Sequence, residues 1–122
     1  MPCVARHAGV MASDAEKILT NLRKGVLEFC VLAALAGEPQ YGRSLALSLS
    51  GKGLLAGEGT VYPLLLRLRD AGLVTSELTD PREGRQRRYH SLTDSGRARL
   101  EDFRAAWAPF RTTVDDLLET HP

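Results

Sequence analysis

The hydrophobic residues of the chain recur mainly three and four positions apart, which is the spacing of an α-helix. The first such stretch predicts a long helix over about residues 14–36. Ser13 and Glu16 form a capping-box pattern at its start, and Gly37 ends it. Residues 1–12 have no hydrophobic period, so we expect a disordered tail there.

Two shorter helices follow in the pattern. Residues 41–50 predict a short helix that is closed by a glycine. Val61, Leu65 and Leu68 recur on one face and indicate a third helix. Gly72 ends this third helix, and the chain then changes from helical spacing to strand-like runs.

The start of the third helix is open between two alternatives, because Pro63 lacks a backbone N–H and clashes with the preceding turn of a helix. If Thr60 is the N-cap, Pro63 falls in the first turn, where its missing N–H has no partner to lose. If Gly57 is the N-cap, Pro63 bends the first turns. In both cases small and hydroxylated residues would let backbone N–H groups approach a phosphate. We therefore expect the outward face of the helix to be a contact surface; it carries Gly59, Thr60, Tyr62, Pro63, Leu66 and Asp70, flanked by Arg67 and Arg69.

A hairpin with a basic tip is expected after the third helix. Residues 73–78 and 87–92 are short runs rich in Val, Thr, Tyr and Leu, and a turn with Pro81 and Gly84 separates them. Residues 82–88 contain four arginines and one glutamate, which is a local charge of +3. A solvated loop is the plain alternative, but a basic hairpin directly after a helix is typical of a DNA-binding wing.

The last helix is expected to start at Thr93, which is an N-cap candidate, and to run to about Glu119. Its apolar residues alternate at spacings of three and four, as in a heptad seam: Leu100, Phe103, Trp107, Phe110, Val114 and Leu117. Packing against the first helix of the same chain is one interpretation. We favour a homodimer, because a domain of this size has little core left for a stripe of that length. Pro109 lies inside the seam and predicts a kink.

Composition limits these interpretations to a single globular domain. The chain has 122 residues, 43% of them hydrophobic and 25% charged, with a formal net charge of +1. Because the net charge is near zero, any affinity for DNA must come from a local patch. The sequence has no signal peptide and no apolar span of about 20 residues, so we expect a cytoplasmic protein without a membrane partner.

Catalysis and metal binding are not expected. The histidines His7, His90 and His121 are scattered, and no serine or cysteine is placed with a base in a recognisable motif. Residues 51–59 are rich in glycine but lack the Lys-Ser/Thr pair of a phosphate-binding loop. Cys3 and Cys30 fit neither a disulfide framework nor a metal-ligand spacing. We therefore expect no enzyme activity, no metal and no cofactor.

Four stretches of the sequence form a recognisable set: LEFCVLAALAGEPQYG, EGTVYPLLLRL, AGLVTSE and GRQRRYHSLTDSG. Together they resemble the PadR family of winged-helix transcriptional regulators of the short C-terminal helix type, over roughly residues 22–118. The resemblance implies a mainly α fold with a small β-hairpin wing, namely a winged helix-turn-helix domain over 13–92 and a C-terminal dimerisation helix over 93–119.

The resemblance assigns roles to individual positions. In the family a Gly-Thr-apolar-Tyr-Pro run opens the recognition helix, and a tip with glycine and arginine forms the wing; the matching residues here are Gly59, Thr60, Val61, Tyr62, Pro63, Gly84, Arg85, Arg87 and Arg88. Three positions depart from the pattern. Gly57 replaces a polar capping residue, Leu66 stands where a basic residue is common, and His90 takes the second aromatic position of the wing strand.

The resulting functional hypothesis is a sequence-specific, ligand-responsive repressor that binds a pseudo-palindromic double-stranded operator as a homodimer. Its expected DNA contacts are Tyr41, Arg43, Gly59, Thr60, Tyr62, Pro63, Arg67, Arg85, Arg87 and Arg88. The alternative is a winged-helix module that binds protein, and the outward Leu66 favours that alternative. Trp107 near the middle of the seam, by the same resemblance, would line a dimer-interface cavity for a planar aromatic effector, although a simple core role is the other interpretation.

Overall fold

The structure, a computed structural model, describes residues 8–80, 82 and 84–121, with residues 8–13 as backbone only. It is mostly helical and contains one small antiparallel sheet of three strands in the order β1-β3-β2. This architecture confirms the predicted winged helix-turn-helix fold class. The elements in chain order are α2 (Ala8–Gly37), β1 (Gln40–Tyr41), α3 (Gly42–Gly51), the short 3-10 helix η1 (Glu58–Thr60), α4 (Val61–Asp70), β2 (Val74–Leu78), β3 (Arg88–Leu92) and α5 (Asp94–Thr120).

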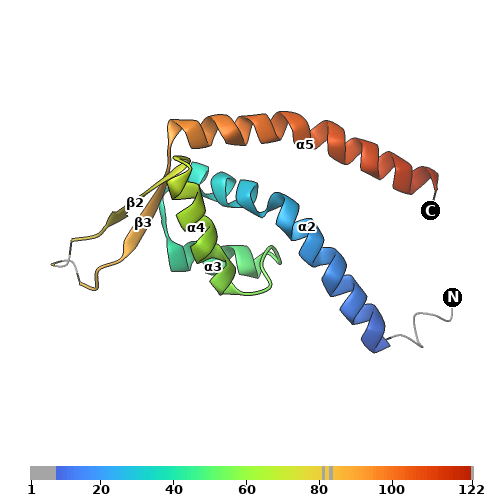
Figure 1. Ribbon diagram of the computed structural model, residues 1–122, viewed down its shortest axis with the longest axis horizontal. Helices are drawn as coiled ribbons and strands as arrows, with labels where there is room; N and C mark the ends of the chain where they lie inside the picture. The colour runs from blue at the N-terminus through green and yellow to red at the C-terminus, as the bar shows by residue number, and fades with distance from the viewer. Residues whose placement is uncertain (1–7, 81, 83, 122) are drawn as a thin grey trace.

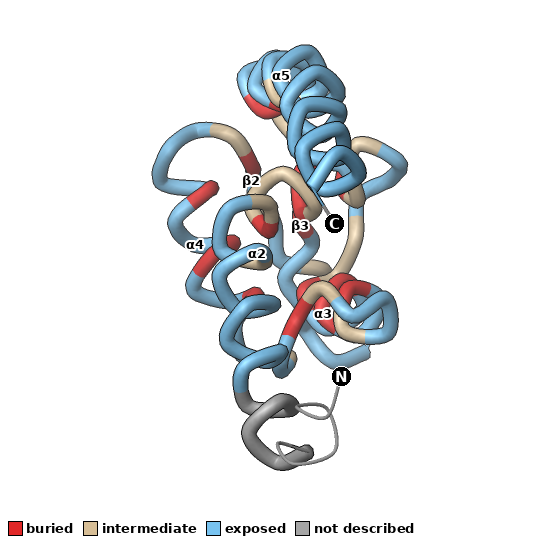
Figure 2. Tube along the Cα trace, turned by 90° about the vertical axis from the view of Figure 1, so that its right-hand side faces the viewer, coloured by how far each residue is buried: buried red, intermediate tan, exposed pale blue. Residues whose placement is uncertain are grey.

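The hydrophobic core lies between the C-terminal part of α2, α3, α4 and the sheet. Its fully buried large side chains are Val31, Leu32, Leu35, Leu45, Val61 and Val74. The N-terminal half of α2 extends away from this core, the hairpin β2–β3 projects from it, and α5 lies over the C-terminal part of α2 (Figure 1). Most of α5 and residues 14–22 of α2 are therefore exposed, whereas the buried residues gather on the C-terminal part of α2, on α3 and on α4 (Figure 2), with Val74 and His90 in the sheet.

The predicted start of the first helix was wrong. The helix α2 begins at Ala8 and continues through Ser13, so the capping-box pattern does not mark its N-terminus. Of the expected tail, residues 1–7 lie outside the described part of the chain. A capping pattern does not fix the N-terminus of a helix when the residues before it can also be helical. Here Val10, Met11 and Ala12 precede the pattern and belong to α2.

The second helix begins one residue later than predicted, because Gln40 and Tyr41 are extended. They form β1, which pairs with β3 through Gln40 opposite His90 and Tyr41 opposite Tyr89. A strand of two residues has no period of its own, so the hydrophobic pattern did not reveal it. Its pairing attaches the start of α3 to the sheet and thereby places α3 beside the wing.

The start of α4 follows the first of the two alternatives. The α-helix begins at Val61 with Thr60 as its N-cap, so Pro63 lies in the first turn. Gly57 is extended and caps only the preceding turn of 3-10 helix, η1. Gly72 then ends α4 with a φ of 78°, a left-handed conformation that favours glycine.

The hairpin and the last helix also match the prediction within a residue or two. The strands β2 and β3 pair in register from Val74 opposite Leu92 to Leu78 opposite Arg88. The hydroxyl of Thr93 accepts a hydrogen bond from the Gly96 N–H at 3.0 Å and caps α5 as predicted. Pro109 lies inside α5, which continues through it without interruption. Among the described residues, no helix has the length and apolar character required to span a membrane.

Candidate nucleic-acid interface

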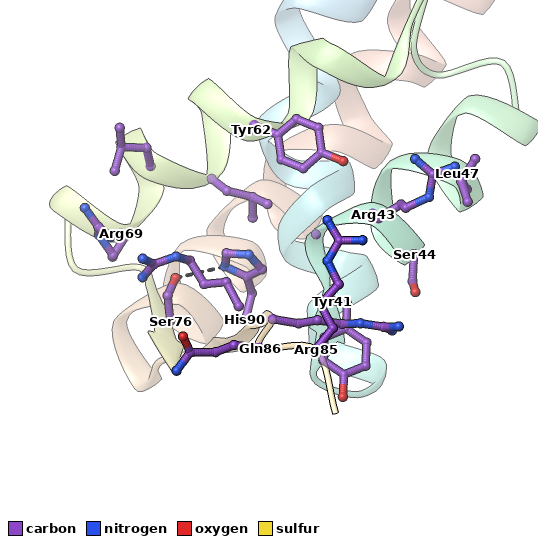
Figure 3. A pocket seen from close by; sticks show the side chains of 15 residues that line it. Tyr41, Arg43, Ser44, Leu47, Tyr62, Arg69, Ser76, Arg85, Gln86 and His90 are labelled. Carbon is purple, nitrogen blue, oxygen red and sulfur yellow. Dashed lines mark hydrogen bonds between the residues drawn. The ribbon is translucent and has the colours of Figure 1, made fainter. Parts of the chain in front are cut away.

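A groove of about 1100 Å³ lies between α3, α4 and the wing, which we define as the hairpin β2–β3 with its connecting loop. Five arginines from these three elements line it, so the positive charge is collected from distant parts of the sequence. Figure 3 shows Arg43, Tyr62, Arg69 and Arg85 arranged around this hollow. We call it the wing groove.

The wing groove brings together most of the predicted DNA contacts. Those that line it are Tyr41, Arg43, Tyr62, Arg85, Arg87 and Arg88. The other four predicted contacts do not line the groove: Gly59, Thr60, Pro63 and Arg67. These four are exposed on α4 and on the turn before it.

Tyr62 is positioned by a glycine on the neighbouring helix. A Cβ atom on Gly42, the first residue of α3, would lie only 3.2 Å from Cε1 of Tyr62 and 3.4 Å from Nε2 of His90. The missing side chain therefore leaves the space in which the Tyr62 ring rests against the start of α3. With 45% of its surface exposed, Tyr62 still presents its ring to the groove.

His90 borders the same space at Gly42 and is the one buried polar side chain among the described residues. Its Nδ1 is 2.9 Å from Oγ of Ser76, across the pairing of β2 with β3. Burial, and then the positive charges of Arg88 and Arg69, hold the pKa of His90 below its usual value. The ring is therefore neutral at pH 7 and adds hydrogen-bonding atoms rather than charge to the groove.

The wing arginines differ in what holds them. The guanidinium of Arg87 lies 5.2 Å from the centre of the Tyr41 ring, which itself packs edge-on against Tyr89 at 4.9 Å. No carboxylate of the described part of the chain forms an ion pair with Arg85, Arg87 or Arg88. These three guanidinium groups are consequently available to phosphates.

Sequence reasoning missed several residues of the wing groove. Arg69 was treated only as a flank of the helix face, and His90 only as a departure in the wing; both line the groove, together with Ser44, Leu47, Ser76 and Gln86. The alternation of inward and outward residues along β2 and β3 was the available signal for Ser76 and His90, because these two face each other. Leu66, predicted to be outward, is 49% exposed and lies in the groove.

The predicted seam on α5 is divided between covered and uncovered residues. Leu100 is buried, and Phe103 stacks on Phe29 of α2 at 4.2 Å between ring centres. Trp107 stacks in turn on Phe103 at 5.5 Å and remains 37% exposed. The later seam residues, with Leu118 beside them, are exposed: Phe110, Val114 and Leu117. Packing on the chain's own first helix thus accounts for the start of the seam only.

A second apolar surface lies on the N-terminal half of α2. Ile18 and Leu22 are 60% and 61% exposed, and Leu19 is 41% exposed. Exposed hydrophobic residues at helical spacing on two long helices are unusual for a monomer of this size. Both helices therefore carry apolar faces that the single chain leaves uncovered.

Comparison with known proteins places these observations among transcriptional regulators. A family model described as the transcriptional regulator PadR-like family matches residues 31–102. The chain is also 33% identical over 88 residues to the transcriptional regulator Rv3488 of Mycobacterium tuberculosis. This alignment covers 72% of this chain and 81% of that protein.

Two solved structures are similar in fold as well as sequence. The crystal structure of a PadR family transcriptional regulator from Eggerthella lenta superposes with a TM-score of 0.78 and 36% identity, covering 91% of this chain and 99% of that chain. The crystal structure of Bacillus subtilis PadR in complex with operator DNA has a TM-score of 0.58 and 27% identity, over 64% of this chain and 46% of that chain.

Proposed function

The chain belongs to the PadR-like family of transcriptional regulators, and on this premise we propose that it is a sequence-specific repressor that binds operator DNA as a homodimer and responds to a planar aromatic ligand. The observation that carries the DNA-binding part is the wing groove, in which five arginines and Tyr62 converge from α3, α4 and the wing. The similarity to a regulator whose structure contains operator DNA supports it.

In this proposal the arginines of the wing provide general affinity for DNA, and the exposed face of α4 provides sequence specificity. Arg85, Arg87 and Arg88 neutralise phosphates or enter the minor groove, which provides affinity for any sequence. The exposed face of α4 enters the major groove, where Tyr62 reaches base edges and Leu66 contacts thymine methyl groups. On this assignment the apolar Leu66 belongs to a DNA reader.

A binding titration tests this proposal directly. Fluorescence anisotropy compares the duplex upstream of the protein's own reading frame with a random duplex of equal length, at the same salt concentration. We expect operator binding about 1,000-fold tighter than random binding. Equal affinity for the two duplexes would contradict sequence-specific recognition.

A protein-binding module is the second candidate, because Leu47 and Leu66 are each 49% exposed in the wing groove. Such a module would bind neither duplex even at low salt, where phosphate contacts are strongest. The same titration at low salt therefore separates the two candidates.

Replacing Arg87 or Arg88 by Ala should weaken operator and random DNA alike. Each lost phosphate contact should also reduce the slope of log affinity against log salt by up to about 1. Tyr62→Ala should instead reduce the ratio of operator to random affinity, because Tyr62 is assigned to base edges. Anisotropy titrations at several salt concentrations measure both quantities.

Arg104 provides the matched control for the wing arginines. It lies on α5, away from the groove, and pairs with Glu101 at 2.8 Å. Arg104→Ala removes the same charge and should leave the salt slope unchanged. If Arg104→Ala, Arg87→Ala and Tyr62→Ala had the same effect on both duplexes, the division of roles would be wrong.

The repression and ligand-response parts of the proposal rest on the proposed dimer and on the exposed apolar residues of α2 and α5. A dimer bound across a promoter acts most simply by blocking polymerase. Trp107 presents a ring face beyond the Phe29–Phe103 stack, at a position where a second chain would complete a flat apolar cavity. A ligand that changed the spacing of the two α4 helices would change their fit to successive grooves.

A ligand titration tests the effector. The chain contains one tryptophan, so intrinsic tryptophan emission reports on Trp107 alone. We expect at least one compound of a planar aromatic panel to change this emission saturably and to weaken operator binding about ten-fold. Emission that no compound changes would exclude the cavity, whereas saturable emission changes without an effect on DNA affinity would exclude the switch.

A further inference from the structure

A carboxylate lies at the edge of the DNA-binding surface, directly before the recognition helix α4. Glu58 is the first residue of η1, and its Oε1 lies 3.7 Å from Nη1 of Arg43 on α3. Arg43 lines the wing groove with 74% of its side chain exposed, and the Glu58 side chain is 40% exposed. Among the described residues, this is the only ion pair between α3 and η1, and its cation, Arg43, is one of the predicted DNA contacts.

A contribution to the stability of the fold does not account for this ion pair. Both partners are substantially exposed, and ion pairs of this kind contribute little to folding. A carboxylate beside a phosphate-binding surface also repels every phosphate that approaches, whatever the DNA sequence. Glu58 therefore opposes non-specific binding unless the DNA offers it a hydrogen-bond donor.

Resting on the proposed DNA-binding function, we infer that Glu58 is a specificity-determining residue that accepts a hydrogen bond from an exocyclic amino group of cytosine or adenine in the major groove. Residues at the N-terminal end of a recognition helix are those that contact base edges. Amino groups of these two bases are the only donors in the major groove, and a carboxylate has acceptors only.

Binding then proceeds as an exchange of partners. In the free protein Glu58 pairs with Arg43; on the operator Arg43 transfers to a phosphate and Glu58 to the amino group. Where the facing base is guanine or thymine, Glu58 meets acceptor atoms and the complex is penalised. The residue therefore selects its operator mainly by disfavouring other sequences.

Selection from a library of duplexes with a randomised central segment tests this inference. The wild-type chain should enrich a motif with one cytosine or adenine position in each half-site that is lost in E58Q, because glutamine both donates and accepts. E58Q should also bind random DNA about five-fold more tightly, since one negative charge near the phosphates is removed.

E101Q is the matched control, because it makes the same change of charge at an exposed residue of α5 that also pairs with an arginine, Arg104 at 2.8 Å, and does not line the groove. It should keep the wild-type motif and change random binding less than two-fold, as expected of a more distant charge. A motif that is identical for wild type and E58Q would overturn the inference while leaving the proposed function intact. A wild-type chain that enriches no motif would overturn the proposed function and the inference together.

A double-mutant comparison tests the exchange itself. R43A should weaken binding to random DNA more in the E58Q background than in the wild type. In the wild type Arg43 must break its ion pair with Glu58 before it contacts a phosphate, whereas in E58Q there is no such ion pair to break. Equal losses in the two backgrounds would show that Glu58 and Arg43 act independently and would overturn the exchange.

Discussion

Phe110→Asp should convert the proposed dimer into a folded monomer. Phe110 is 63% exposed in the single chain, so aspartate there meets water and leaves the fold intact. In the proposed dimer the same position lies inside the seam, where an unpaired carboxylate would lose its hydration. Because a monomer carries only one winged-helix domain, affinity for an operator with two half-sites should fall about 100-fold or more.

Sedimentation and circular dichroism measure the two halves of this prediction. Thr112→Asp is the matched control, because residue 112 is exposed and projects about 200° around α5 from residue 110, away from the seam. It should remain dimeric with unchanged operator affinity. A wild-type chain that sediments as a folded monomer at micromolar concentration would contradict the proposed dimer.

The fold was predictable wherever a periodic face is buried against the core. Val61, Leu65 and Leu68 recur at helical spacing and are all buried in α4, so the pattern located both the helix and its exposed face. The turn at Gly72 and the runs on either side of the wing loop were equally local signals. Each of these elements is specified by residues within one or two turns of one another.

What the sequence did not reveal depends on contacts between distant residues. β1 exists because two extended residues pair with β3, about fifty positions further along the chain. His90 is buried by Ser76 and by the start of α3, and neither contact leaves a trace in the local pattern around His90. The prediction of where α2 starts was wrong for a different reason, because a good capping sequence lies inside a segment that is helical throughout.

The residues of the candidate site were likewise predictable where they are adjacent in sequence and not predictable where distant segments bring them together. Arginines of the wing loop were recognisable as a charge cluster, because they are adjacent in sequence. Arg69 was not assigned, because its place in the groove depends on the angle between α4 and the wing. The surroundings of Tyr62 were likewise not predictable, since Gly42 had no visible role until α3 and α4 were packed together.

The junction between the wing and α5 gives the prediction with the largest effect on stability. Thr93 connects three groups there: its N–H donates to the Leu73 carbonyl at 3.1 Å, its hydroxyl donates to the Gly72 carbonyl at 2.7 Å, and that hydroxyl accepts from the Gly96 N–H. Gly96 packs directly against this junction. A Cβ on Gly96 would lie 2.2 Å from the Leu73 carbonyl oxygen and 2.5 Å from Cδ1 of Leu92.

Gly96→Ala should therefore lower the free energy of unfolding by about 3 kcal/mol, near the upper end of what overpacking a site usually costs. The clash involves backbone that is already hydrogen-bonded to Thr93, so it cannot be relieved by rotating a flexible side chain. Gly51→Ala adds the same methyl group at the end of α3, where nothing lies within 4 Å, and should change stability by less than about 1 kcal/mol. Urea unfolding of both variants is best measured in the Phe110→Asp background, because unfolding of a monomer does not depend on protein concentration. Equal urea midpoints for Gly96→Ala and Gly51→Ala would show that the junction can move, and α5 would then not be rigidly attached to the wing.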